Sequence, residues 1–285
     1  MRLSNRSQIL LRIGVGLTLA FIYVPLIVIL IYAFNAGKTL EWPPAGLTTD
    51  WFGKAIENSG ARDAFLTSIK AACAATAIAI LLGTLTSLAV SRHRFFGRET
   101  ISFLVLLPIA LPGIVTGIAI NDTFTQVLGV DLSLFTVIVG HATFCIVLVY
   151  NNVVARLRRV STSLEEASAD LGADTWQTFR LVTFPSLRTA LVAGALLAFA
   201  LSFDEIIVTR FTIGADLETL PIWIYNNLFR SNQLPIVNVV AVIVIVISVI
   251  PVYFANKLSQ DVGGGGGRAG GAKPEGLTAE ATAAP

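Results

Sequence analysis

Two adjacent carboxylates, Asp204 and Glu205, stand at the end of an apolar stretch of the sequence. If this stretch is a membrane helix that starts near Leu187, Asp204 lies roughly 25 Å along its axis, in the outer part of the hydrocarbon layer. Ionisable groups at such depth usually face a cavity or a partner, and neighbouring helical residues point about 100° apart, so one of the two should face a cavity. Carboxylates near aromatic rings suit a cation. Two alternatives stay open: both lie at headgroup level, or one pairs with Arg210.

A second stretch that carries chemistry is polar and lies between two apolar ones. We expect a helix with Ser163 as its N-cap and Glu166 at the third helical position of a capping box. Gly172 should end this helix, and a second helix should run from Asp174 to Pro185.

The first of these helices is short, exposed and carries a small residue, Ala167, at its centre. Such a helix can dock in a groove on a partner. The alternative is an interfacial helix lying on lipid, which Trp176 and the nearby arginines would suit.

The composition defines the class of protein that must position these groups. The chain is 54% hydrophobic and 13% charged, whereas a soluble protein carries about 25% charged residues. It is therefore predicted to be an all-α, polytopic membrane protein. The cysteines, Cys73 and Cys145, lie in apolar runs without metal-ligand spacing, so we expect no metal site. His141, in an apolar run, is predicted to be a satisfied polar group inside the bundle.

Six segments are long enough to cross a bilayer, which takes about 20 residues. The second is rich in small residues and should pack inside the bundle. One transmembrane domain at 11–258 is expected, between an N-terminal segment at 1–10 and a disordered tail at 259–285. The six segments are Leu11–Phe34, Ala64–Val90, Ile101–Asn121, Leu132–Ala155, Thr189–Val208 and Leu234–Asn256.

The third segment contains Pro108 and Pro112, followed by Gly113. Proline removes a backbone donor, so this helix should be broken or kinked where protein or water covers the freed groups. A simple kink without a functional role is the alternative.

Orientation follows from the excess of arginine in alternate loops. An even number of spans then places both termini and the loop at 156–188 in the cytoplasm, and the first apolar run is expected to be a retained span. The other loops hold fewer basic residues. The arginines concerned are Arg2, Arg6, Arg12, Arg92, Arg94, Arg98, Arg156, Arg158, Arg159, Arg180 and Arg188.

The polar loop resembles the "EAA" motif of permease subunits in bacterial ABC importers. Glu166-Ala167-Ser168 takes the place of Glu-Ala-Ala, Gly172 that of the glycine, and Val182-Thr183-Phe184-Pro185 that of the final Ile-x-Leu-Pro. The resemblance covers the chain from about Leu11 to Asn256.

This resemblance implies a type I ABC importer permease fold in the bacterial plasma (inner) membrane, with a coupling helix that docks on a separate ATPase. The residues implied in ATPase coupling are Glu165, Glu166, Ala167, Ser168, Gly172 and Pro185. The sequence has no Gly-x-x-x-x-Gly-Lys-Ser/Thr loop, so ATP and Mg²⁺ should bind the partner and this chain should not be an enzyme.

A narrower resemblance is to the second permease of the spermidine/putrescine group. It rests on Arg94–Arg98, Leu107–Ile118, Leu201–Val208 and Leu220–Tyr225. It implies a small cationic substrate, with Ser202, Asp204 and Glu205 in the pathway. Gly113 stands where related permeases often carry an acidic residue.

The implied partners are an ABC ATPase dimer, a second homologous permease, an extracytoplasmic substrate-binding protein and the lipid bilayer; no nucleic acid is expected. The chain would form half of the translocation pathway. The rival interpretation is a self-contained secondary transporter or channel, against which the long docking loop argues.

Overall fold

The computed structural model describes residues 4–263, and all regular secondary structure within them is helical. The prediction of a helical bundle is therefore confirmed. Five of the six predicted segments fall on one helix or on the bent helix pair, whereas the fifth, Thr189–Val208, extends beyond the end of α9. The tail predicted at 259–285 lies outside the described residues, apart from its first positions, which belong to the last helix.

Four helices are long and apolar enough to cross a membrane, and one bent pair would make a fifth. The bent pair joins α4 to α5 and the π-helical turn Thr123–Val127, with 105° between the two parts. The last helix, α12, is apolar from Leu234 to Ser248. The bounds are α1 Asn5–Ala33, α3 Ser59–Arg92, α4 Arg98–Ala110, α5 Gly113–Asp122, α6 Leu134–Leu157, Thr175–Phe203 and α12 Leu234–Gly263.

The helix Thr175–Phe203 has three parts, and four short helices complete the fold. Its parts are α8 Thr175–Thr178, a π-helical turn Phe179–Thr183 and α9 Phe184–Phe203. The short helices are α2 Asp50–Glu57, α7 Ser163–Asp170, α10 Ile207–Thr212 and α11 Leu220–Asn227.

The centre of the bundle is formed by α3, α6 and α9, and small residues bring these helices together. A Cβ on Gly83 of α3 would lie 3.0 Å from the Cβ of Val149 in α6, and one on Gly194 of α9 would lie 3.2 Å from the Cα of the same valine. Val149 is itself fully buried. The Ser87 hydroxyl also donates across the interface to the carbonyl of Tyr150, at 3.2 Å. The predicted interior position of the second segment is therefore confirmed.

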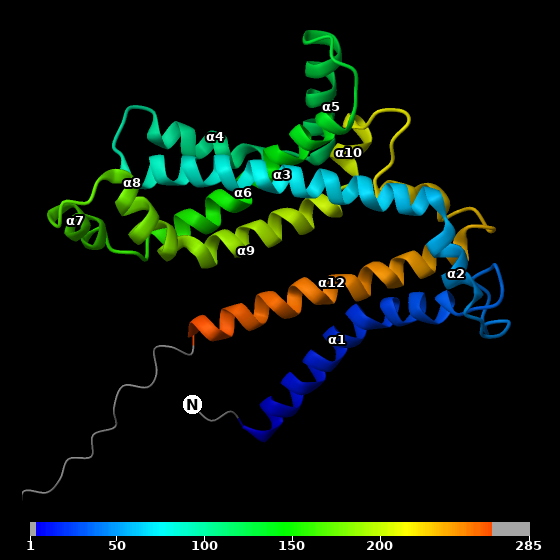
Figure 1. The fold of residues 1–285 in the computed structure, drawn as a ribbon. Helices are drawn as coiled ribbons and strands as arrows, with labels where there is room; N and C mark the ends of the chain where they lie inside the picture. The colour runs from blue at the N-terminus through cyan, green and yellow to red at the C-terminus, as the bar shows by residue number, and fades with distance from the viewer. Residues whose placement is uncertain (1–3, 264–285) are drawn as a thin grey trace, which may run out of the picture.

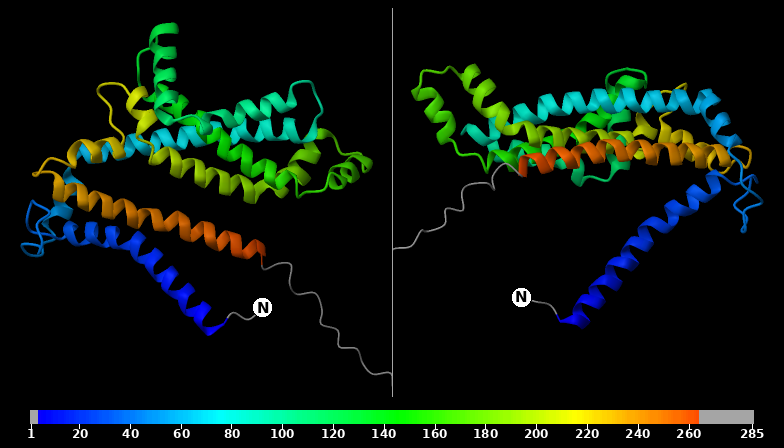
Figure 2. Two further views of the ribbon diagram at one scale, coloured as in Figure 1. Left: turned by 180° about the vertical axis from the view of Figure 1, so that it is seen from behind. Right: turned by 60° about the horizontal axis from the view of Figure 1, so that its bottom comes forward.

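The bundle has two distinct ends. Figures 1 and 2 show the start of α1, the end of α12 and the α7–α8 region toward one end, and α2 toward the other. At the α2 end a second apolar cluster joins α1, α2, α3, α11 and α12 through residues such as Ala33, Trp51 and Trp223. The α5 helix projects from the side of the bundle next to α10 (Figure 1).

Candidate functional site

The predicted end of the fifth segment at Val208 is wrong, because α9 ends at Phe203. The chain is non-helical at 204–206 and resumes as α10 at Ile207. The cause is local. The Glu205 carboxylate accepts a hydrogen bond from the backbone N–H of Val208 at 2.9 Å, which satisfies a free donor in the first turn of α10. Asp204 and Glu205 therefore lie in a break between two helices.

The two carboxylates differ in their surroundings. Glu205 is half-buried and caps α10, whereas Asp204 is exposed. Among the residues whose side chains the structure describes, 4–248, the Asp204 carboxylate has neither a hydrogen bond nor an ion pair, and no ion pair joins Arg210 to either acid. The alternative in which one of them pairs with Arg210 is therefore wrong. Asp204 remains available to a ligand.

A buried imidazole holds the two sides of this break together. His141 of α6 is fully buried, with Nδ1 2.7 Å from the Ser202 hydroxyl in α9 and Nε2 2.8 Å from the Thr209 hydroxyl in α10. Thr209 donates its only hydroxyl proton to the carbonyl of Glu205 at 2.8 Å, so Nε2 must be the donor to Thr209. Nδ1 then accepts from Ser202. This confirms His141 as a satisfied interior group; its partners could not be read from the sequence.

The break in the third segment lies beside the break that carries the carboxylates. Pro112 is the N-cap of α5, whereas Pro108 lies within α4 without ending it. A Cβ on Gly113 would lie 3.7 Å from Ile207, the first residue of α10. Farther along, the Asn121 amide of α5 donates to the carbonyl of Phe211 in α10 at 2.6 Å. Two interrupted helices thus meet at one place, an arrangement that membrane proteins tolerate where backbone lines a cavity or is covered by protein.

The polar loop folds into two short helices separated by a glycine turn. The N-cap of α7 is Thr162, so the predicted cap at Ser163 is wrong by one residue; the Ser163 hydroxyl lies 2.7 Å from that of Ser161 instead. Gly172 ends the helix with a φ of 85°, in the left-handed region that favours glycine. Asp174 then caps α8, accepting from the backbone N–H of Gln177 at 2.7 Å.

The two glutamates of α7 point in different directions. One oxygen of Glu165 lies 3.0 Å from the Arg92 Nε atom, and the other accepts from the Thr183 hydroxyl at 3.0 Å. Glu166 and Ala167 are exposed. Nothing in the sequence distinguishes the two glutamates, and the position of Arg92 predicts only the orientation of its loop.

The remaining predicted loop residues are placed as follows. The Ser168 hydroxyl lies 3.0 Å from that of Thr178 and holds α7 against α8. Pro185 is exposed in the first turn of α9, where its missing N–H costs no hydrogen bond. The exposed surface of the loop thus centres on Glu166, Ala167 and the glycine turn.

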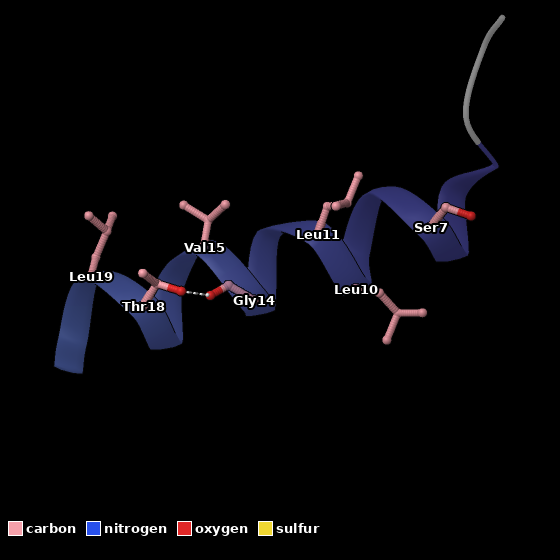
Figure 3. Close-up of a pocket in the computed structure, with 7 residues that line it drawn as sticks. All are labelled: Ser7, Leu10, Leu11, Gly14, Val15, Thr18 and Leu19. Carbon is pink, nitrogen blue, oxygen red and sulfur yellow. Dashed lines mark hydrogen bonds between the residues drawn. The ribbon is translucent and has the colours of Figure 1, made fainter. Parts of the chain in front are cut away.

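A hollow of about 570 Å³ along α1 differs from the carboxylate site and from the polar loop (Figure 3). It is lined by one helix alone, and its polar groups are already used locally, since the Thr18 hydroxyl donates to the carbonyl of Gly14 at 3.0 Å. A surface formed by one apolar helix suits lipid. Among the described residues, no group of three or more His, Cys, Asp or Glu side chains is placed to hold a metal ion.

Comparison with known protein families gives one match over most of the chain. The family model described as "Binding-protein-dependent transport system inner membrane component" matches residues 75–263. The match includes the second half of α3, all of α7 and the carboxylates at 204 and 205.

Two relatives are similar over most of their length. The putrescine transport system permease protein PotI of Escherichia coli is 33% identical over 233 residues, which cover 79% of this chain and 82% of the relative. The spermidine/putrescine transport system permease protein PotC of the same organism is 31% identical over 243 residues, covering 85% and 90%.

A solved structure shares the fold. The crystal structure of a bacterial ABC transporter involved in the import of the acidic polysaccharide alginate has a chain that superposes with a TM-score of 0.68 at 19% identity. The superposition covers 92% of this chain and 99% of the other. At this identity the likeness establishes the arrangement of helices and not the substrate.

Proposed function

The chain belongs to the family of binding-protein-dependent transport system inner membrane components, and we propose that the permease subunit it forms imports polyamines such as putrescine and spermidine. Proteins of this family are permease components of ABC transporters, and ATP is hydrolysed by a separate subunit, so the chain itself is not an enzyme. This excludes the self-contained secondary transporter or channel considered above.

One observation carries the choice of substrate: an exposed carboxylate without a protein partner lies where two interrupted helices meet. Asp204 offers both oxygens to a ligand, and Glu205 beside it keeps one oxygen free of hydrogen bonds in the described structure. Putrescine and spermidine are flexible chains with ammonium groups, and a carboxylate is the natural partner of such a group. The relatives named for these substrates support the same class.

Aromatic side chains lie next to this site on the preceding turn of α9. The rings of Phe199 and Phe203 stack with centroids 6.0 Å apart, and Phe65 of α3 meets Phe203 edge-on at 6.0 Å. Ring faces attract ammonium groups. We assign these phenylalanines to the methylene chain and the second ammonium group of the substrate.

The proposed topology has six spans with both termini in the cytoplasm. The start of α1, the end of α12 and α7 lie toward the same end of the bundle (Figure 1), as an even number of spans requires. The arginine-rich loops at 92–98 and 156–162 are at that end as well. The opposite end, with α2, would then face outward.

The complete importer would contain a second permease, an ATPase dimer that holds ATP and Mg²⁺, and an extracytoplasmic binding protein. In this assembly the present chain forms half of the pathway. Glu166, Ala167 and Gly172 would lie at the contact with the ATPase, because they are exposed on α7 and in the turn after it, at the end of the bundle that we propose to be cytoplasmic.

Uptake by the complete transporter tests this function. The partner subunits are co-expressed with this chain in cells lacking their own polyamine uptake, and entry of labelled putrescine and spermidine is measured. Asp204→Asn should lower uptake about tenfold by removing one ion pair to the substrate. Asp216→Asn is the matched control, because Asp216 is also exposed but lies in the loop after α10. Unchanged uptake in Asp204→Asn, or no competition by excess polyamine, would refute the substrate.

A further inference from the structure

An ion pair joins the coupling loop to a helix that crosses the bundle. Arg92 is the last residue of α3, and Glu165 lies in the first turn of α7; their Nε and Oε2 atoms are 3.0 Å apart. The second carboxylate oxygen accepts from Thr183, in the π-helical turn that leads into α9. Three elements of the chain therefore meet at one carboxylate.

The surroundings make this pair stronger than an ordinary surface pair. The side chains of Arg92 and Glu165 are only 15% and 21% exposed, so water screens their attraction less than it would at the surface. The arginine is at the C-terminus of its helix and the glutamate near the N-terminus of its own, the positions that the two helix dipoles favour. The Nε and Nη2 atoms of Arg92 are both buried without a hydrogen bond in the described structure, so Nε meets Glu165 as a charge at 3.0 Å and not as an aligned donor. Glu165 is the carboxylate that compensates the positive charge of Arg92.

The helix that ends at Arg92 reaches the opposite end of the bundle. With 34 residues, α3 is about 51 Å long. Near its start, the Ser68 hydroxyl accepts from the backbone N–H of Leu220 in α11 at 2.8 Å. Along its length, Gly83 allows contact with α6 too close for any side chain larger than hydrogen. A displacement of the Arg92 end would therefore act on a helix that contacts α6 and α11.

We infer that Arg92, Glu165 and Thr183 form a latch that transfers movement of α7 to α3 and α9 during transport. The inference rests on the proposed role of α7 as the ATPase-docking helix. It assigns separate tasks to neighbouring glutamates: Glu166 faces the partner, whereas Glu165 is a positioning residue within the chain. Without the latch, the ATPase still docks and hydrolyses ATP, but less of its movement reaches the membrane helices.

The test is the ratio of uptake to ATP hydrolysis in the complete transporter, reconstituted in vesicles. Glu165→Gln and Arg92→Gln should each lower this ratio about tenfold, which corresponds to ~1.4 kcal/mol and lies between the values for exposed and buried ion pairs. Co-purification of the ATPase should be unchanged. The exchanged pair Arg92→Glu with Glu165→Arg should recover most of the ratio. Thr183→Val, which removes only the hydroxyl, should lower the ratio by a smaller factor. It provides a second test if the exchanged-pair variant does not insert into the membrane.

Two matched controls separate the latch from general effects of charge. Glu99→Gln removes an exposed carboxylate that lines the same pocket as Arg92 and has no ion pair in the described structure, so the ratio should stay at the wild-type value. Glu166→Gln should weaken ATPase co-purification instead of the ratio. If Glu165→Gln loses the ATPase as Glu166→Gln does, Glu165 is a docking residue and the latch is refuted. An unchanged ratio in both Arg92→Gln and Glu165→Gln refutes it equally.

A failure of the proposed substrate gives a different result. The wild-type complex would then hydrolyse ATP without importing polyamines. Hydrogen exchange still tests the latch in that case: ATP should change the protection of the last turn of α3 in the wild type and leave it unchanged in Glu165→Gln. The same ATP-dependent change in both proteins would overturn the latch.

Discussion

Replacing His141 by alanine tests whether the imidazole holds the helix break in place. The substitution removes two hydrogen bonds, of 2.7 Å to Ser202 and 2.8 Å to Thr209. Their consequences differ. Thr209 keeps its bond to the carbonyl of Glu205, whereas the Ser202 hydroxyl, which is 2% exposed, loses its partner.

The expected loss in the free energy of unfolding follows from these two hydrogen bonds. Loss of the Thr209 bond should cost about 1 kcal/mol, and the stranded Ser202 hydroxyl about 1–2 kcal/mol more. The vacated volume of a fully buried ring adds a further cost of cavity formation, so we expect a total of about 3 kcal/mol. Ser202→Ala should cost only about 1 kcal/mol. In a double-mutant cycle the two residues should show a coupling of about 1 kcal/mol, within the range found for membrane helices.

The assay is reversible unfolding of the purified subunit in mixed micelles or bicelles, followed by helix signal and by a tryptophan probe. Ser231→Ala, which removes an exposed hydroxyl without a hydrogen bond in the described structure, in the turn before α12, is the control and should leave the free energy of unfolding unchanged within about 0.5 kcal/mol. Additive effects of His141→Ala and Ser202→Ala, with no coupling, would refute the hydrogen bond between the two side chains. A total cost below about 1 kcal/mol would refute the buried site.

Three further substitutions test other parts of the structure. Gly83→Val should destabilise the bundle by about 1–3 kcal/mol, because a Cβ there already lies 3.0 Å from the Val149 Cβ and from the carbonyl oxygen of Ile146. Thermal unfolding measures this effect, and Gly16→Val, at an exposed position with open space, is the control. Gly172→Val should cost about 1–2 kcal/mol through its φ of 85° and shift the turn, lowering uptake; Gly172→Asn, which tolerates this conformation, should retain more. Glu166→Lys should abolish co-purification of the ATPase without loss of membrane insertion, and normal co-purification would contradict its docking role.

The sequence predicted those parts of the fold that depend on local patterns. Apolar length located the long helices, and proline at 112 located the bend in the third segment. The glycine turn at 172 followed from the end of a polar helix. Each of these features has its cause within a few neighbouring residues, so one sequence was enough to find it.

The relations across the bundle could not be predicted in this way. Glu165 and Glu166 are alike in sequence, and only the position of Arg92, on another helix, decides which of them turns inward. His141 gave no hint that its partners would be Ser202 and Thr209, because contacts 61 and 68 residues apart depend on how three helices pack. The apolar residues at 206–208 extend the predicted fifth segment beyond the true end of α9, and the sequence does not show that the Glu205 carboxylate accepts from the Val208 N–H as a new helix starts at Ile207.

The helix Thr175–Phe203 joins the α7 region at one end to the Asp204 carboxylate at the other. Its 29 residues span about 44 Å without an intervening loop, from the Asp174 cap beside α7 to the Asp204 carboxylate. Thermodynamic linkage between the ends of such an element is reciprocal. If the proposed cation site and the proposed docking surface are both correct, the change in cation affinity caused by ATPase docking must equal the change in ATPase affinity caused by cation binding. A transporter with bound substrate would therefore bind its ATPase with a different affinity from an empty one. In this way substrate binding to this chain would influence the ATPase, just as ATP binding influences this chain.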